Sequence, residues 1–142
     1  MNLDPRELLA SIRYMTLATV GADGRPWASP VWYAAPAPSE LLWVSQPGAR
    51  HSRNIANRPE VAIVIFDSTV PNEDAQAVYM EATASQTGEG VERLSAASVS
   101  AGGEPWTAAE VTGSAKHRLY RADVTRCWML GAEEERVEVK LV

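Results

Sequence analysis

Positive charge is concentrated in one short stretch of an otherwise acidic chain. "ARHSRNIANRPE" (49–60) holds three arginines and one of the two histidines, although the 142 residues carry a formal net charge of -5. The basic segment between Gly48 and Pro59, about nine residues long, is predicted to be a short helix that ends at the proline. The spacing i, i+3, i+4 and i+7 places four polar side chains on one face of that helix: Arg50, Arg53, Asn54 and Asn57.

A helix that begins beside arginines can bind a phosphate, because its free backbone N–H groups and the guanidinium groups all donate to the anion. Arg50 and His51 lie in the first turn of the predicted helix, with Arg53 and Asn54 one turn further on. The same spacing is also typical of a solvated basic helix face. Charge spacing alone leaves both alternatives open.

Strands must position this helix. "LLWVSQ" (41–46) precedes it and "VAIVIF" (61–66) follows it, and the second is apolar at every position, as in a strand covered on both faces. Residues 14–20 and 27–34 are predicted to form a hairpin around an Asp-Gly turn. Pro30 within the second of these strands favours an edge of the sheet, where a missing N–H is harmless.

The remaining segments complete one predicted domain over residues 1–142. A helix begins at Asp4-Pro5, and "APAPSE" (35–40) is expected to be a loop. Further elements are a strand over 78–88, a helical pattern over 89–100, a loop or short helix over 100–114, and strands over 117–130 and 135–142. About seven strands and two or three short helices favour a mainly β protein with a closed or half-closed antiparallel sheet.

Several classes of function find no support in the residues. Cys127 is the only cysteine, so no intrachain disulfide forms, which suits a reducing cytoplasm. His51 and His117 are the only histidines, and no carboxylates repeat at metal-ligand spacing. The acidic balance disfavours nucleic acid, and no apolar run approaches the ~20 residues of a membrane span. We expect a cytoplasmic protein that binds neither metal nor membrane.

Tryptophan is unusually frequent, with five residues against one phenylalanine. Trp27, Trp32 and Trp43 all lie on the strands that lead to the basic helix. Aromatic walls beside an anion site suit a flat aromatic ligand that carries a phosphate. Taken singly, each tryptophan is better explained by a place in the core or at a dimer interface.

The order of these motifs resembles a known family. "YMTLATVGADGRPWASPVWYA" followed by "LLWVSQPGARHSRNIANRPEVAIVIF" is similar to the pyridoxamine 5′-phosphate oxidase-like proteins, and "HRLYRADVTRCWML" resembles their late strand. The general-stress-protein and deazaflavin-reductase types are the most similar members. The resemblance implies an antiparallel split β-barrel of the FMN-binding type, which forms a homodimer with cofactor sites at the subunit interface.

The resemblance also implies which positions hold the cofactor. The phosphate would be held by Arg50 and His51, with Arg53 and Asn54 behind them. Here Arg50-His51 replaces the family's Arg-Lys or Lys pattern, so a titratable group stands where a fixed charge is common. The other implied contacts are along the second strand, on the third strand and, from the partner subunit, on the late strand: Ala28, Ser29, Pro30, Val31 and Trp32, then Val44 and Ser45, then Trp128.

The function implied is an FMN-dependent oxidoreductase that acts on an unidentified small molecule, with no catalytic residue assigned. The alternatives are a reductase that uses the deazaflavin F420, a non-catalytic module that binds flavin or haem, and a split barrel without a cofactor. True pyridoxamine 5′-phosphate oxidases hold their substrate with arginine and histidine in a further C-terminal segment. This sequence ends at "VEVKLV", so we do not expect a B6 vitamer as substrate.

Overall fold

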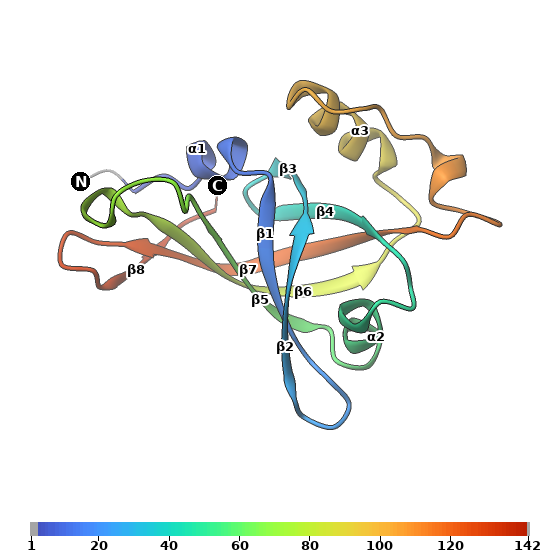
Figure 1. The fold of residues 1–142 in the computed structure, drawn as a ribbon, viewed down its shortest axis with the longest axis horizontal. Coiled ribbons are helices and arrows are strands. Elements are labelled where there is room, and N and C mark those ends of the chain that lie inside the picture. Colours follow the sequence, from blue (N-terminus) through green and yellow to red (C-terminus); the bar gives the residue numbers. More distant parts are fainter. Residues whose placement is uncertain (1–2, 142) are drawn as a thin grey trace.

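The computed structural model describes residues 3–141, which form one strongly curled antiparallel sheet with short helices around it (Figure 1). The strands are β1 (Tyr14–Val20), β2 (Pro26–Trp32), β3 (Ala34–Ala37), β4 (Glu40–Ser45), β5 (Glu60–Phe66), β6 (Ala77–Gln86), β7 (Arg118–Leu130) and β8 (Arg136–Val139). Their order in the sheet is β2-β1-β5-β6-β7-β4-β3, and β8 pairs with β7. The mainly β, antiparallel split-barrel architecture is confirmed.

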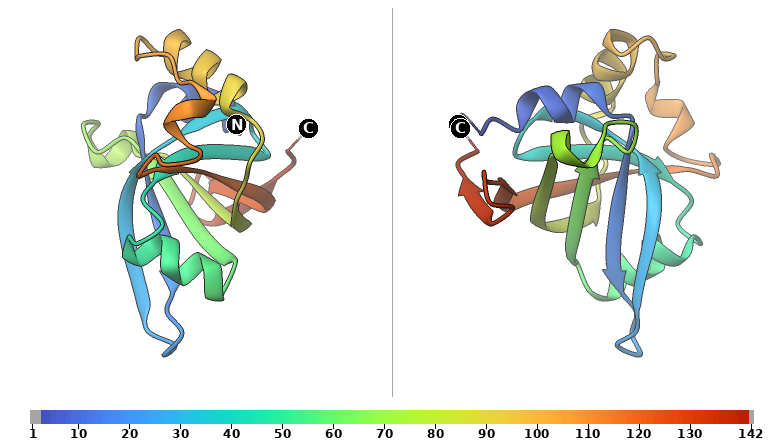
Figure 2. Two further views of the ribbon diagram at one scale, coloured as in Figure 1. Left: turned by 90° about the vertical axis from the view of Figure 1, so that its right-hand side faces the viewer. Right: turned by 60° about the vertical axis from the view of Figure 1, so that its left-hand side comes forward.

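Three α-helices flank the sheet of the described chain: α1 (Arg6–Ser11), α2 (Arg50–Asn57) and α3 (Val91–Ser100). Figures 1 and 2 show α1 and α3 near one end of the barrel and α2 near the other. Helix α1 begins as expected, because Pro5 has helical dihedral angles and the Asp4 carboxylate accepts the backbone N–H of Arg6 at 3.0 Å. No helix within residues 3–141 combines the length and the apolar character needed to cross a membrane.

The chain turns a corner at Tyr33. The predicted strand 27–34 ends at Trp32, and β3 occupies part of the segment 35–40 that was expected to be a loop. Tyr33 is buried, its hydroxyl donates to the Leu9 carbonyl at 2.7 Å, and its backbone N–H donates to the Arg13 carbonyl at 3.3 Å. These bonds stabilise the corner. The strands on either side of it, β2 and β3, form the two opposite edges of the same sheet. Pro30 lies on the edge strand β2, as predicted.

The main core fills the barrel interior. Met15, Leu17, Leu41 and Trp43 are among its fully buried members, and Trp43 stacks on Tyr120 with ring centroids 5.9 Å apart. Trp43 was considered as a wall of the ligand site, but its ring is wholly inside the core. β4 alternates its side chains across the sheet, and this position points inward. Cys127 is also buried there, and burial raises the pKa of its thiol to about 11.

A second, smaller core lies on the other face of β3 and β4, beneath α3. Leu42, Leu94, Val111 and Leu119 are buried in it, and Trp106 packs against its rim. The segment 100–114 contains only a short 3-10 turn, Ala108–Glu110, in agreement with the predicted loop or short helix. The Arg118 guanidinium stabilises the segment that leads into β7 by donating hydrogen bonds of 2.7 Å to three backbone carbonyls: those of Gly113, Ala115 and His117.

The expectation that "VAIVIF" is covered on both faces is wrong for the single chain. β5 alternates: Val61, Ile63 and Ile65 face the core, while Ala62, Val64 and Phe66 face outward. Because only one face of a curled sheet lines the barrel interior, the other face is exposed, and 48% of Phe66 is accessible. Tyr79 and Trp128 lie on this outer face and line a shallow cavity of about 380 Å³ with residues of β1 and β5.

Candidate functional site

Helix α2 begins without a cap. Its N-cap residue is Ala49, which has no side-chain hydrogen bond to offer, and the first turn contains no acidic residue. No acceptor atom among the described residues takes a hydrogen bond from the backbone N–H groups of Arg50, His51 or Ser52. These donors and the positive end of the helix dipole are therefore available to an anion.

The guanidinium of Arg50 lies over the ring of Trp27, 4.1 Å from its centroid. Trp27 is on β2 and 40% of it is exposed, so the pair lies at the surface. No carboxylate within residues 3–141 forms an ion pair with Arg50. The tryptophan thus positions the charged group of the first residue of α2 without neutralising it.

His51 has a different environment from Arg50. Its Nε2 lies 3.0 Å from the Ser45 hydroxyl at the end of β4. The ring is half-buried, and this burial lowers the pKa of His51 below its ordinary value, because imidazolium is poorly solvated there. His51 is therefore neutral near pH 7, and Arg50 and Arg53 supply the fixed positive charge.

Asn54 does not share the exposed face on which it was placed. It is buried, and its side-chain amide donates to the hydroxyl of Thr19 on β1 at 3.0 Å. Its helical position borders that of Ile55, which is buried as expected, so the sheet covers both. Arg50, Arg53 and Asn57 do lie exposed, whereas Ala56, which was expected to face the sheet, is exposed too.

The candidate positions of β2 divide between the two faces of the strand. Val31 is in the core, so only its backbone is available to a ligand. Ala28 and Pro30 are exposed and Ser29 is half-buried. Trp32 is half-buried against the second core, beneath α3. Strand alternation accounts for this division, which the sequence resemblance did not resolve.

The remaining candidates lie in two places. Ser45 is next to His51, and Val44 packs against the second core. Trp128 lies on the outer face of the sheet, where the guanidinium of Arg126 is 4.7 Å from its ring centroid. Any contact between Trp128 and a cofactor bound to another subunit stays a prediction.

Two residues near the site were missed. Thr19 holds Asn54, and Arg118 is the register partner of Ser45 across β4 and β7. The sequence indicated Thr19 only weakly, as a threonine that faces inward on the predicted strand 14–20. Nothing in the sequence pairs Ser45 with Arg118, because that contact depends on the order of strands in the sheet.

The family model described as pyridoxamine 5′-phosphate oxidase matches residues 5–131. The chain belongs to this family. The match includes every strand from β1 to β7, so it contains both α2 and the β2 strand beside it. No curated protein sequence matches the chain closely enough to show a relationship.

Solved structures share the family's fold. A heme binding protein from Mycobacterium smegmatis is 23% identical with a TM-score of 0.71. The match covers 99% of this chain and 59% of the heme binding protein, so this chain spans little more than half the length of that protein. An F420 reductase is 21% identical (TM-score 0.64, 89% and 98% covered). A putative 5-nitroimidazole antibiotic resistance protein from Bacteroides thetaiotaomicron is 10% identical (TM-score 0.69, 91% and 84% covered).

Proposed function

We propose that this chain binds FMN and works as a flavin-dependent oxidoreductase on a small molecule. The observation that carries the proposal is the Arg50 guanidinium, held over Trp27 beside the uncapped start of α2. A phosphate fits such a place, because backbone N–H donors and an arginine without a carboxylate partner lie next to one another. Flavin supplies reversible hydride and electron transfer when it is bound.

The residues of the chain bind and orient the cofactor. Arg50 and Arg53 supply positive charge for the phosphate, and the paired Ser45 and His51 offer a neutral hydrogen-bonding group beside it. The exposed side of β2, at Ala28 and Pro30, is available for the flavin ring. Because His51 is neutral at pH 7, the positive charge for the phosphate comes from the arginines and the positive end of the α2 dipole alone.

We also propose that two copies of the chain associate through the outer face of the sheet. The face carries Ala62, Val64, Phe66, Tyr79 and Trp128, which is more apolar surface than a strand facing water needs. A second copy packed there would bury "VAIVIF" on both faces, as its composition suggests, and would bring Trp128 of that copy toward the cofactor.

The deazaflavin F420 is the second candidate, since it also carries a phosphate and one fold neighbour is an F420 reductase. Haem is less well supported by the side chains. Of the two histidines, His51 is half-buried with Nε2 engaged by Ser45, and His117 is exposed. Neither is presented as a free axial ligand over an apolar pocket.

A spectrum of the purified protein, followed by mass spectrometry of the released ligand, tests this proposal. We expect a yellow protein with the two absorption bands of flavin and the mass of FMN. Release of F420 would replace FMN with the second candidate, and a Soret band would establish haem. A colourless protein that takes up neither flavin nor F420 would contradict the oxidoreductase proposal.

A further inference from the structure

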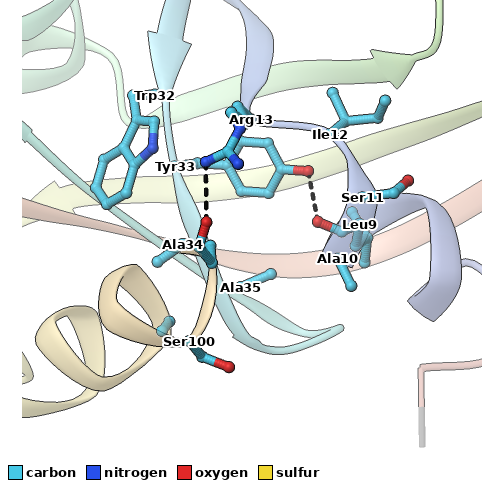
Figure 3. A pocket seen from close by; sticks show the side chains of 12 residues that line it. Leu9, Ala10, Ser11, Ile12, Arg13, Trp32, Tyr33, Ala34, Ala35 and Ser100 are labelled. Carbon is cyan, nitrogen blue, oxygen red and sulfur yellow. Dashed lines mark hydrogen bonds between the residues drawn. The ribbon is translucent and has the colours of Figure 1, made fainter. Parts of the chain in front are cut away.

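A cavity of about 350 Å³ lies near the other end of β2 from the α2 site (Figure 3). Its wall consists of the last turn of α1, the β2–β3 corner and the last turn of α3. Small side chains leave this space open between the three elements: Ala10, Ala34, Ala35, Ala97 and Ala101. The volume is at the lower end of the range for small-molecule sites, so it suits a ligand of one or two rings.

β2 connects this cavity with the proposed cofactor site. Trp32, the last residue of the strand, lines the cavity, and Trp27, five residues earlier, contacts Arg50. Five residues of extended strand span about 16 Å. Trp27 and Trp32 project from opposite faces of β2, which is an edge strand. If the proposed function holds, a cofactor with its phosphate at Arg50 passes around this edge to place its ring on the Ala28 and Pro30 face, toward the cavity. The role as a substrate pocket rests on that proposed function.

Arg13 gives the cavity its only charged lining side chain within residues 3–141. Its Nη1 donates to the backbone carbonyl of Ala101 at 3.1 Å, at the end of α3. The other N–H groups of the guanidinium have no acceptor among the described residues, and no carboxylate lines the space. The cavity therefore contains spare donors next to the aromatic surface of Trp32.

The two helices that end at the cavity influence which ligand charge the cavity accepts. α1 and α3 both reach the cavity with their last turns, and each helix C-terminus carries about half a negative charge. Together they offset the single positive charge of Arg13. The partial negative charge of the two helix ends disfavours a carboxylate, and Arg13 disfavours an ammonium, so an uncharged ligand with an oxygen acceptor fits best.

We propose that this cavity is the substrate pocket and that it binds an uncharged, flat aromatic compound with a carbonyl or amide oxygen. Arg13 donates a hydrogen bond to that oxygen, and the ring lies against Trp32. The alanines of α3 and β3 set the width of the pocket and limit the ligand to one or two rings.

Three probes of one shape test the choice of ligand: 2-naphthamide, its anionic counterpart 2-naphthoate and the cationic 2-naphthylmethylamine. Calorimetry on the purified full chain should give one 2-naphthamide site per chain, with the two charged probes weaker by about tenfold or more. The indole N–H signal of Trp32, identified with Trp32→Phe, should shift on binding. Equal or tighter binding of 2-naphthoate, no binding of 2-naphthamide, or an unmoved Trp32 signal would overturn the proposal.

Variants locate the binding. Arg13→Leu should weaken 2-naphthamide by about tenfold, and Arg13→Lys should restore most of the affinity. Arg6→Leu, which removes the same charge from the exposed start of α1, is the matched control and should change nothing. Since Arg13→Leu also loses the bond to Ala101, Ser100→Phe gives a second test that keeps Arg13 and fills the cavity from an exposed position. Unchanged affinity in Ser100→Phe contradicts the location.

The cofactor proposal and the pocket proposal can be tested separately. Arg50→Ala should lose the cofactor and keep 2-naphthamide binding, because Arg50 is at the other end of β2. A protein without any cofactor that still binds 2-naphthamide through Arg13 would refute the oxidoreductase proposal but establish the pocket. A flavoprotein that fails the probe and variant tests would refute only the pocket.

Discussion

The Arg50 guanidinium lies 4.1 Å from the centroid of the Trp27 ring, which joins the first turn of α2 to the edge strand β2. This contact restricts the conformations that the Arg50 side chain can adopt. The pair thereby prepares the charge for a ligand before the ligand arrives, and reduces the ordering cost of binding.

Arg50→Ala should weaken cofactor retention by about ten- to hundredfold, because it removes one charge-assisted contact to the phosphate. Dialysis followed by flavin fluorescence measures the loss. Arg58→Ala is the control: it removes the same charge from the far end of α2, where the side chain reaches only the Ala22 carbonyl at 3.4 Å. Equal losses in both variants would contradict the assignment of the phosphate to the helix start.

Trp27→Leu tests whether the ring positions Arg50. A cation–π contact at the surface is worth about 0.5–1 kcal/mol, so cofactor affinity should fall by about two- to fivefold, less than in Arg50→Ala. In Arg50→Ala the further change Trp27→Leu should have little effect. Independent, additive losses in the double variant would show that Trp27 acts on the ligand directly rather than through Arg50.

His51 predicts a pH dependence of stability. Burial lowers its pKa in the folded protein below the ordinary 6.5, so the unfolded chain takes up a proton first as the pH falls. Its contribution to stability is complete above about pH 6.5 and is lost as the pH decreases toward the folded pKa. Between about pH 7.5 and about pH 5, His51→Gln should lose less Tm than the wild type.

The matched control for this pH series is His117→Gln, which removes the exposed histidine. It should follow the wild type at every pH. Parallel curves for His51→Gln and the wild type would show that the half-buried ring of His51 contributes nothing to the acid sensitivity.

Val64→Asp should prevent self-association, because the residue lies on the apolar outer face of β5 and a charge there would face the second copy. Sedimentation should show a folded monomer with poor cofactor retention. Val99→Asp adds the same charge at an exposed valine of α3, away from that face, and should stay dimeric. A wild-type chain that sediments as a monomer at high concentration would refute the interface.

Much of the fold could be predicted from alternation and turn signals. Residues 78–88 alternate in the sequence, and β6 buries Val78, Met80, Ala82 and Ala84 as that pattern requires. The uniform run of β5 was misread, because apolar residues on an outer face are indistinguishable in one sequence from residues in a core. The break at Tyr33 was missed since it depends on bonds to Leu9 and Arg13, which are distant in sequence.

The candidate site was predictable only in part. Helix position and charge located Arg50 and Arg53, but helical spacing alone placed Asn54 on the wrong side, because burial depends on how the helix rests on β1. The contact between Arg50 and Trp27 joins two residues 23 positions apart in the sequence and has no local signal. The neutral state of His51 likewise follows from burial, which a sequence does not display.

The place of β7 in the sheet sets the order in which the barrel can form. This strand lies between β6 and β4, so β3 and β4 are not paired with the rest of the sheet until residues 118–130 are available. During synthesis the barrel therefore cannot close before residues 118–130 have left the ribosome, and two unpaired edges stay open until then. Such non-local pairing is slow, and this interval is when the nascent chain is most exposed to aggregation and most dependent on chaperones.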